Sequence, residues 1–244
     1  MQVAGIDLAW GARARTGIAV TDQQGSLLRS GSVLTDDDIA EFLAGSSLAA
    51  IAIDAPIIVT NATGMRECER ELSRDFRRFH AGTHPTNLCR PSMRPQPRAM
   101  RLVEQHGWAT IPAGEASPAR PVALEVYPHS SMVGLFGLSR ILEYKAKSGR
   151  TLPMRKGQFD VLMRLMERHC ETPLALTRNS RWLELRVIAA SAQRQSDLNL
   201  IEDEIDAIFC AYVAWVFATS PQALTSYGDP TTGVIVTFPP LRRA

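Results

Sequence analysis

The stretch Val3-Ala4-Gly5-Ile6-Asp7-Leu8-Ala9-Trp10-Gly11 decides how the rest of the chain is interpreted. It is a short apolar run with one carboxylate near its end and a glycine after it, which is typical of a buried strand. An acidic side chain on a buried strand is costly unless another group compensates its charge. Asp7 therefore indicates a binding site rather than ordinary core.

Two further predicted strands carry an acid in a similar place. Asp54 follows the apolar run 50–53, and Glu125 lies within the run 122–127. In open α/β sheets, ligands gather beyond the carboxyl ends of the strands, so these acids share one rim if their strands are neighbours. A cluster at 202–206 opens the apolar helix predicted over 200–217, where Asp203 and Asp206 are three residues apart and share a face.

Carboxylates brought this close repel one another, and a bound cation would neutralise them. Ligands made only of oxygen select Mg²⁺ or Mn²⁺ over softer metals, and two such ions can clamp the attacking and leaving oxygens of a phosphoryl displacement. The predicted metal ligands are Asp7, Asp54, Asp203 and Asp206. The predicted catalytic residues are Asp7, Asp54, Asp206 and Glu125, with Glu125 as a ligand or as a base that orients water.

Each acid also has an ordinary structural interpretation. Acids in the first turn of a helix are common dipole partners, which suffices for Glu202 and Asp203. Asp54 precedes Ala-Pro, where it could cap the turn that ends its strand. Glu125 could pair with an arginine from the segment that precedes it. The joint placement of the acids, rather than any single one, favours a metal site.

The composition indicates an ordinary globular protein. The 244 residues are 45% hydrophobic and 21% charged, with a net charge of +2, which alone does not predict a nucleic-acid partner. The four cysteines lack the paired spacing of zinc or redox motifs, so reduced thiols in a cytoplasmic protein are expected. A signal peptide and a membrane-spanning run are not predicted, and no membrane partner is expected.

The order of elements predicts one α/β domain over 1–244. Strands at 16–20 and 26–34 follow the first strand by tight turns, which favours antiparallel pairing. The all-apolar run ending at Asp54 favours a central parallel strand. Helices and strands then alternate, so the fold class is a mixed sheet of antiparallel hairpin strands and parallel strands, flanked by helices. An Arg/Pro-rich insertion of helix and loop is predicted at about 60–120. Helices are predicted at 64–79, 98–106, 154–169 and 174–194, and a last strand at 233–238.

The insertion supplies most of the basic charge. Residues 61–101 hold nine arginines and no lysine, and the planar guanidinium matches phosphate geometry. The alternative is a solvated helix face with ion pairs between successive turns. The residues predicted to contact nucleic acid are Arg66, Arg70, Arg74, Lys145 and Lys147. His80, His84 and His129 could join the site, although histidines in proline-flanked loops are more often surface residues.

These motifs together resemble a known family. Gly5-Ile6-Asp7-Leu8-Ala9-Trp10, Ile53-Asp54-Ala55-Pro56, Arg66-Glu67-Cys68-Glu69-Arg70, Glu125-Val126-Tyr127-Pro128 and Asp206-Ala207 are similar to domain-of-unknown-function family 429. The resemblance implies an RNase H-like fold, which Holliday-junction resolvases and integrases share. It also implies that the first-strand acid Asp7, the strand-end acid Asp54 and the helix acids Asp203 and Asp206 bind metal. Glu125 has no counterpart in that comparison.

The favoured interpretation is a nuclease that uses Mg²⁺ or Mn²⁺ to hydrolyse phosphodiester bonds of structured DNA or RNA. A first alternative is an ATPase or phosphotransferase of the actin and sugar-kinase type, because Gly5-Ile6-Asp7 precedes a hairpin with Thr16-Gly17. The chain lacks a second glycine-rich phosphate loop, which argues against it. A second alternative is a non-catalytic binding protein with a degenerate metal site.

Overall fold

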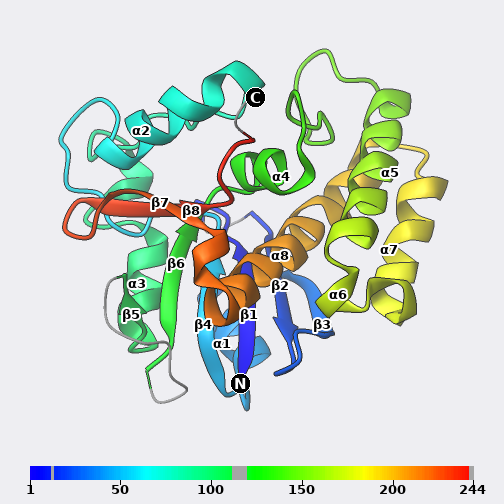
Figure 1. Cartoon of the computed structure of the whole chain (residues 1–244), viewed down its shortest axis with the longest axis horizontal. Helices are drawn as coiled ribbons and strands as arrows, with labels where there is room; N and C mark the ends of the chain where they lie inside the picture. The colour runs from blue at the N-terminus through cyan, green and yellow to red at the C-terminus, as the bar shows by residue number, and fades with distance from the viewer. Residues whose placement is uncertain (12–13, 112–119, 242–244) are drawn as a thin grey trace.

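The computed structural model describes residues 1–11, 14–111 and 120–241. Its strands form one eight-stranded sheet (Figure 1). Their bounds are β1 (Gln2–Asp7), β2 (Thr16–Thr21), β3 (Leu27–Val33), β4 (Leu48–Ile53), β5 (Ala109–Thr110), β6 (Val122–Val126), β7 (Thr225–Asp229) and β8 (Gly233–Thr237). The helices are α1 (Asp36–Leu43), α2 (Glu67–Phe76), α3 (Arg98–Gln105), α4 (Pro128–Phe136), α5 (Leu152–His169), α6 (Glu171–Leu174), α7 (Ser180–Ser191) and α8 (Gln195–Thr219). Short 3₁₀ turns lie at Arg77–Phe79, Pro91–Met93, Leu176–Arg178 and Pro221–Ala223.

The sheet combines both kinds of pairing, in the order β3-β2-β1-β4-β6-β8-β7. β1, β4, β6 and β8 run parallel, whereas β2 and β3 at one edge and β7 at the other are antiparallel to their neighbours. The predicted α/β class with a mixed sheet is therefore confirmed, and it is consistent with the RNase H-like arrangement. The buried parallel strands explain the unbroken apolar runs at 3–6 and 48–53.

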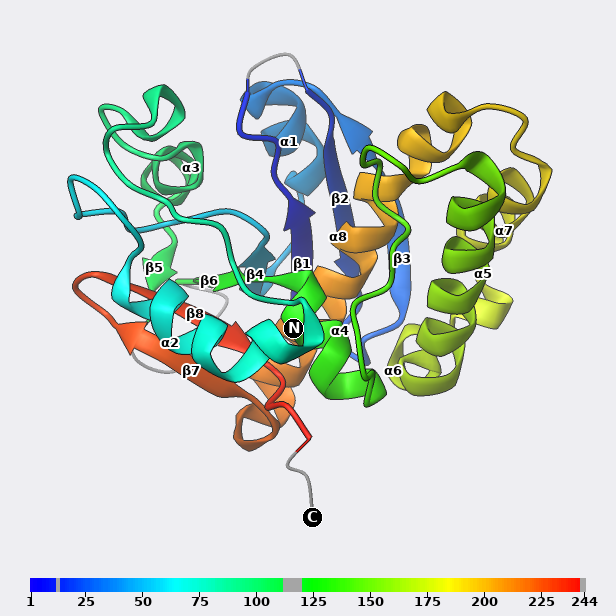
Figure 2. The ribbon, with the colours of Figure 1, turned by 90° about the horizontal axis from the view of Figure 1, so that it is seen from above.

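Helices cover both faces of the sheet (Figure 2). On one face, α1 and α3 bury Ile39 and Leu102 against the strand residues Ile6 and Ile51. On the other face lies α8, which is buried throughout residues 204–214, with α5 and α7 packed on its outer side. α8 is 25 residues long, yet no helix in the described ranges combines the length and apolarity needed to cross a membrane.

Two glycines let α8 lie directly on the strands. A Cβ atom at Gly5 of β1 would come within 2.1 Å of the Ala207 carbonyl oxygen. A Cβ atom at Gly17 of β2 would come within 1.8 Å of the Asp203 carbonyl oxygen. Neither distance is sterically possible, so the close approach of strand and helix backbones requires glycine at both positions.

The segment between β4 and β6 corresponds to the predicted insertion, although its residues 112–119 lie outside the described ranges. Its helix α2 packs Leu72 and Phe76 against Ile235 of β8 and Tyr227 of β7 (Figure 1). β7 was not predicted, because its sequence Thr-Ser-Tyr-Gly-Asp lacks the apolar character of the buried strands.

Several predicted boundaries are wrong. The helix predicted at 64–79 is the shorter α2, and the helix predicted at 174–194 divides into α6, a 3₁₀ turn and α7. The last helix begins at Gln195 rather than Leu200, because the Asp197 carboxylate accepts hydrogen bonds from the amides of Gln193 and Arg194 and so caps an earlier turn. The acids at 202–206 therefore lie well inside α8, and the first-turn dipole explanation for them no longer applies.

Candidate carboxylate site

Two of the predicted acids lie side by side at the carboxyl ends of neighbouring parallel strands. Asp7 is the last residue of β1, and Asp54 directly follows β4. The strands pair Ile6 with Ile53, and the Asp54 amide donates a 2.8 Å hydrogen bond to the Ile6 carbonyl oxygen. The parallel register therefore fixes the two acids at the same rim.

α8 brings the other two acids to this rim. Asp206 is completely buried, and the Asp203 backbone lies against Gly17 of β2. Asp203, Asp206 and Asp54 all act electrostatically on Asp7. The structure thus places Asp7, Asp54, Asp203 and Asp206 near enough to interact electrostatically, whereas their role as metal ligands stays a prediction. We call these four residues the carboxylate site.

A lysine lies among these acids. Lys145 Nζ is 2.7 Å from Asp206 Oδ2 and 3.6 Å from Asp7 Oδ2. Both Oδ2 atoms are buried and accept no hydrogen bond of normal geometry from the described residues, so the ammonium pairs with them as a charge. The sequence analysis assigned Lys145 to a nucleic-acid surface. The structure instead directs its side chain into the carboxylate site.

Burial and mutual repulsion hold protons on these acids. Burial, together with the charges of Asp54, Asp206 and Asp203, raises the pKa of Asp7 well above its ordinary value, although Lys145 opposes the rise. Burial raises the pKa of Asp54 to about 7, with Asp206 and Glu125 adding to the rise. Burial and the nearby Asp206 raise the pKa of Asp203 to about 6. Lys145 alone therefore does not neutralise the site, and without a further cation these carboxylates take up protons more readily than free ones do.

Aromatic side chains pack beside the carboxylate site. The buried Tyr144 hydroxyl donates a 2.7 Å hydrogen bond to Asp206 Oδ1. The His129 ring lies between Tyr127 and Tyr144, with ring centroids 5.8 Å and 5.7 Å away. Burial, followed by the charge of Lys145, lowers the pKa of His129 to about 4. His129 is thus a neutral imidazole next to the acids rather than a surface residue, and only long-range packing of α4 places it there.

Glu125 is not available to the site in the predicted way. Its two carboxylate oxygens accept hydrogen bonds of 2.9 Å and 2.5 Å from the Arg66 guanidinium. The Ile57 amide donates a third, of 2.9 Å. Arg66 also donates to Glu69, and all three charged side chains are buried. Glu125 therefore has the ion-pairing role that was left open as its alternative, and Arg66 is buried in that pair instead of facing a phosphate.

The other acids of α8 fasten neighbouring segments. Glu204 is buried and accepts hydrogen bonds from Arg181 and Ser30. Glu202 accepts from the buried Arg155 at 2.8 Å and from the Ala146 amide at 3.2 Å. Because these partners occupy Glu202 and Glu204, only Asp203 and Asp206 of the cluster contribute to the carboxylate site.

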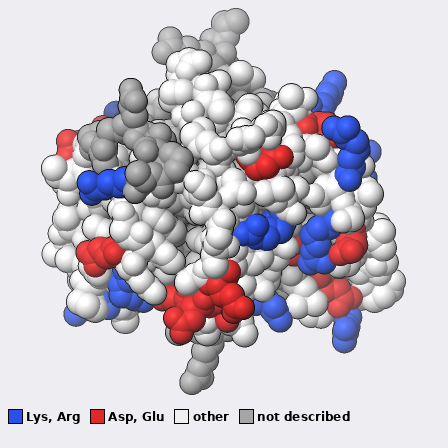
Figure 3. All heavy atoms as spheres, turned by 90° about the horizontal axis from the view of Figure 1, so that it is seen from below, with Lys and Arg blue, Asp and Glu red and all other residues white. Residues whose placement is uncertain are grey.

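The remaining predicted phosphate contacts are exposed but dispersed. Arg70, Arg74 and Lys147 lie at the surface. Arg74 lines a hollow with Arg78 and Tyr227 beside β7, apart from the pocket that contains Asp54. On the face shown in Figure 3, acidic side chains gather near the lower edge, and basic side chains are scattered over the rest. The structure therefore does not gather these residues with Arg66 and Lys145 into one basic surface.

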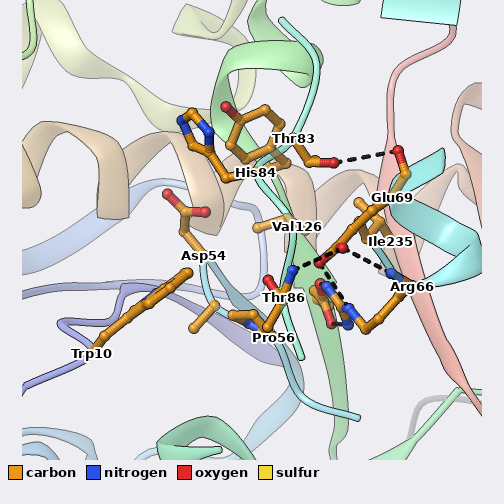
Figure 4. A pocket seen from close by; sticks show the side chains of 13 residues that line it. Trp10, Asp54, Pro56, Arg66, Glu69, Thr83, His84, Thr86, Val126 and Ile235 are labelled. Atoms are coloured by element: carbon orange, nitrogen blue, oxygen red, sulfur yellow. Dashed lines mark hydrogen bonds and ion pairs between the residues drawn. The ribbon is translucent and has the colours of Figure 1, made fainter. Parts of the chain in front are cut away.

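A pocket opens next to Asp54 (Figure 4). The Asp54 carboxylate and the His84 ring lie above its floor, which the Arg66–Glu125–Glu69 ion pairs form. The Trp10 side chain makes one wall, and Trp10 is 40% exposed. A flat ring face, one carboxylate and one imidazole at the mouth give the pocket both an apolar and a polar side.

The four carboxylates fit a hard divalent cation in chemistry, because they offer oxygen ligands alone. The two buried Oδ2 atoms without hydrogen bonds lie where such an ion would find ligands. However, within the described ranges no three acidic, histidine or cysteine side chains are already arranged to hold a metal ion. The carboxylate oxygens are thus suitable ligands for a divalent cation, and Lys145 lies between two of these acids, Asp7 and Asp206.

Comparison with known proteins gives one match. The family described as "Protein of unknown function (DUF429)" matches residues 5–232. No curated protein and no solved structure matches the chain. The match covers all four acids of the carboxylate site.

Proposed function

Because the chain belongs to the DUF429 family, whose function is unknown, we propose from the site itself that it is a phosphodiester hydrolase that uses Mg²⁺ or Mn²⁺. The proposed ligands are Asp7, Asp54, Asp203 and Asp206, and the proposed substrate is a nucleic acid. The fold we propose is RNase H-like, and the proposed location is the cytoplasm.

The observation that carries this proposal is that Asp7, Asp54, Asp203 and Asp206 interact electrostatically at one sheet rim, where Lys145 supplies the salt bridges that the described residues make to them. The raised pKa values of Asp7, Asp54 and Asp203 support this proposal, because burial and neighbouring charges disfavour the ionised forms of these three acids. Such destabilised titratable groups are typical of functional sites. A purely structural cluster would be expected to pair each acid with its own cation, as Glu125 and Glu204 are paired here.

The residues around the carboxylates would each contribute to the reaction. A bound divalent ion would supply a nucleophilic water of lowered pKa and would stabilise the negative charge on the phosphoryl oxygens. Tyr144 orients the Asp206 carboxylate through its hydrogen bond. His129 is neutral at pH 7, because burial and the charge of Lys145 lower its pKa to about 4, so we propose that it orients a water molecule through a hydrogen bond. The exposed face of Trp10 would stack on a base next to the scissile phosphate.

Replacing Asp7 tests the proposal. Asp7→Asn keeps the shape of the side chain and removes one ligand charge, so Mn²⁺-dependent cleavage of DNA or RNA oligonucleotides should fall by about 10²–10⁴-fold while the fold is kept. The matched control is Asp197→Asn, on the same helix as Asp206 but engaged only at the helix start. Full activity in purified Asp7→Asn protein would refute the mechanism.

One observation favours the alternative of a binding protein with a degenerate site. Lys145 already pairs with Asp7 and Asp206, and the described residues show no three ligands arranged for a metal. Under this alternative, Mn²⁺ would raise the thermal stability of the protein, and neither DNA nor RNA would be cleaved.

A further inference from the structure

Lys145 lies where a cation bound to Asp7 and Asp206 would have its charge. Its Nζ atom is 2.7 Å from one carboxylate and 3.6 Å from the other. We propose that Lys145 is a built-in cation that holds the carboxylate site in the metal-free protein and competes with the divalent ion for the same oxygens. This inference rests on the proposed metal site.

The competition follows from charge and position. An ammonium and a divalent ion that contact the same two buried carboxylates repel one another strongly in a setting of low dielectric constant. The positive charge of Lys145 would therefore have to leave Asp7 and Asp206 when the metal ion binds. The cost of this displacement weakens the apparent affinity of the protein for the metal.

The backbone around Lys145 is held in place, so the side chain alone can make this movement. Arg155 Nε donates a 2.7 Å hydrogen bond to the Tyr144 carbonyl oxygen, and Glu202 accepts from the Ala146 amide. Arg155 and Glu202 also pair with each other at 2.8 Å. Lys145 thus has an anchored residue on each side.

The side chain of Lys145 has a route to solvent. It is 27% exposed, in contrast to Asp206, which is fully buried. Its four-carbon stem has several freely rotating bonds, so the ammonium can swing outward without unfolding the loop. After this movement it would face the solvent side of the site, where a substrate phosphate would approach.

Metal binding to the free protein gives a test that does not depend on catalysis. Isothermal titration with Mn²⁺ should show that Lys145→Met binds the ion at least about tenfold more tightly than the natural protein does. Lys147→Met, in the same loop but exposed, is the matched control and should leave Mn²⁺ affinity unchanged. Equal or weaker Mn²⁺ binding by Lys145→Met would overturn the inference, as would a lack of binding in both proteins.

A second measurement uses the unmodified chain, in case the Lys145→Met protein does not fold. Brief acetylation followed by peptide mass spectrometry reports the reactivity of each lysine. Saturating Mg²⁺ should increase the labelling of Lys145 at least about threefold and should leave Lys147 unchanged. Unchanged or reduced labelling of Lys145 would contradict its displacement. Tighter Mn²⁺ binding by Lys145→Met without any nucleic-acid cleavage would refute the hydrolase and leave the competition established.

Discussion

The Tyr144 hydroxyl donates a 2.7 Å hydrogen bond to Oδ1 of Asp206. The other oxygen of that carboxylate, Oδ2, is left for Lys145, at 2.7 Å. The Asp206 oxygen bound by Tyr144 therefore has a fixed partner, because the tyrosine is wholly buried. The oxygen near Lys145 has a partner that can be exchanged, because the lysine reaches solvent. This division allows the acid to keep its orientation while its cation changes.

The pH dependence of the free energy of unfolding should report the raised pKa of the buried Asp54 carboxyl group. Its pKa is about 7 in the folded protein, above the ordinary value of about 3.9 expected in the unfolded chain. Between these values the folded state binds a proton that the unfolded state has released, so stability falls as pH rises from 4 to 7. Asp54→Asn removes this loss. The Tm advantage of Asp54→Asn should therefore be small at pH 4 and largest above pH 7.

Metal-free melting curves from pH 4 to 8 measure this difference, and each kcal/mol relieved raises Tm by about 2–4 °C for a chain of this size. Asp38→Asn is the control, because hydrogen bonds with Thr35 and Leu34 lower the pKa of Asp38. Its Tm loss should stay nearly constant above pH 4. A constant Tm difference between Asp54→Asn and the natural chain would show that Asp54 is not strained.

Glu125→Gln should destabilise the fold instead of selectively stopping the reaction. The substitution removes one of the two charged partners of the buried Arg66 guanidinium, and breaking a buried ion pair typically costs about 3–5 kcal/mol. Urea unfolding measures this cost, and Glu184→Gln, in an exposed pair with Arg181, should cost at most about 1 kcal/mol. Natural stability combined with lost Mn²⁺ affinity would return Glu125 to the metal site.

Gly17→Ala should disturb the contact between β2 and α8. The added methyl group would overlap the Asp203 carbonyl oxygen, so the helix must move, at a cost of about 1–3 kcal/mol or more. Denaturant unfolding gives the loss, and Mn²⁺ titration shows whether Asp203 has moved with the helix. Gly11→Ala, where a Cβ atom has no neighbour within 4 Å, is the matched control. Unchanged stability of Gly17→Ala would mean that β2 and α8 are less closely packed.

Trp10→Ala should weaken the binding of single-stranded oligonucleotides. Stacking of one base on an aromatic ring contributes about 1–3 kcal/mol, so the Kd should rise about 5- to 150-fold. Fluorescence anisotropy with EDTA present measures binding without cleavage. Trp10→Phe keeps a ring face and should recover most of the affinity. Equal Kd values for the natural protein and Trp10→Ala would remove the pocket from the nucleic-acid site.

The sequence was sufficient for the buried parallel strands β1 and β4 and for the acids at their ends. Apolar runs at 3–6 and 48–53 mark the buried parallel strands, and the strand-end positions of Asp7 and Asp54 follow from them directly. The tertiary fold, rather than local sequence, determines which other acids lie near Asp7 and Asp54. Asp203 and Asp206 face the sheet rim because Gly5 and Gly17 admit α8, a contact between segments nearly two hundred residues apart.

The partners of the charged residues could not be read from local patterns. The Arg66–Glu125 pair joins residues 59 positions apart, and no periodicity distinguishes Arg66 from the other arginines of its segment. Lys145 lies in a stretch with Lys147 and Arg150, which by composition resembles a solvated basic loop. Its direction depends on tertiary contacts of the neighbouring backbone, in which Arg155 donates to the Tyr144 carbonyl oxygen and Glu202 accepts from the Ala146 amide.

The glycines at positions 5 and 17 have no functional group, yet they set the distance between the strands and the helix that carry the carboxylate site. Where backbone rests on backbone, the gap between strand and helix is set by the peptide chain itself, and no rotamer can adjust it. A mutational survey limited to charged residues would therefore overlook two positions that determine how far apart those charges stand. A design that builds this carboxylate site into another scaffold would need to reproduce the backbone contact of Gly5 and Gly17 with α8 as well as the acids.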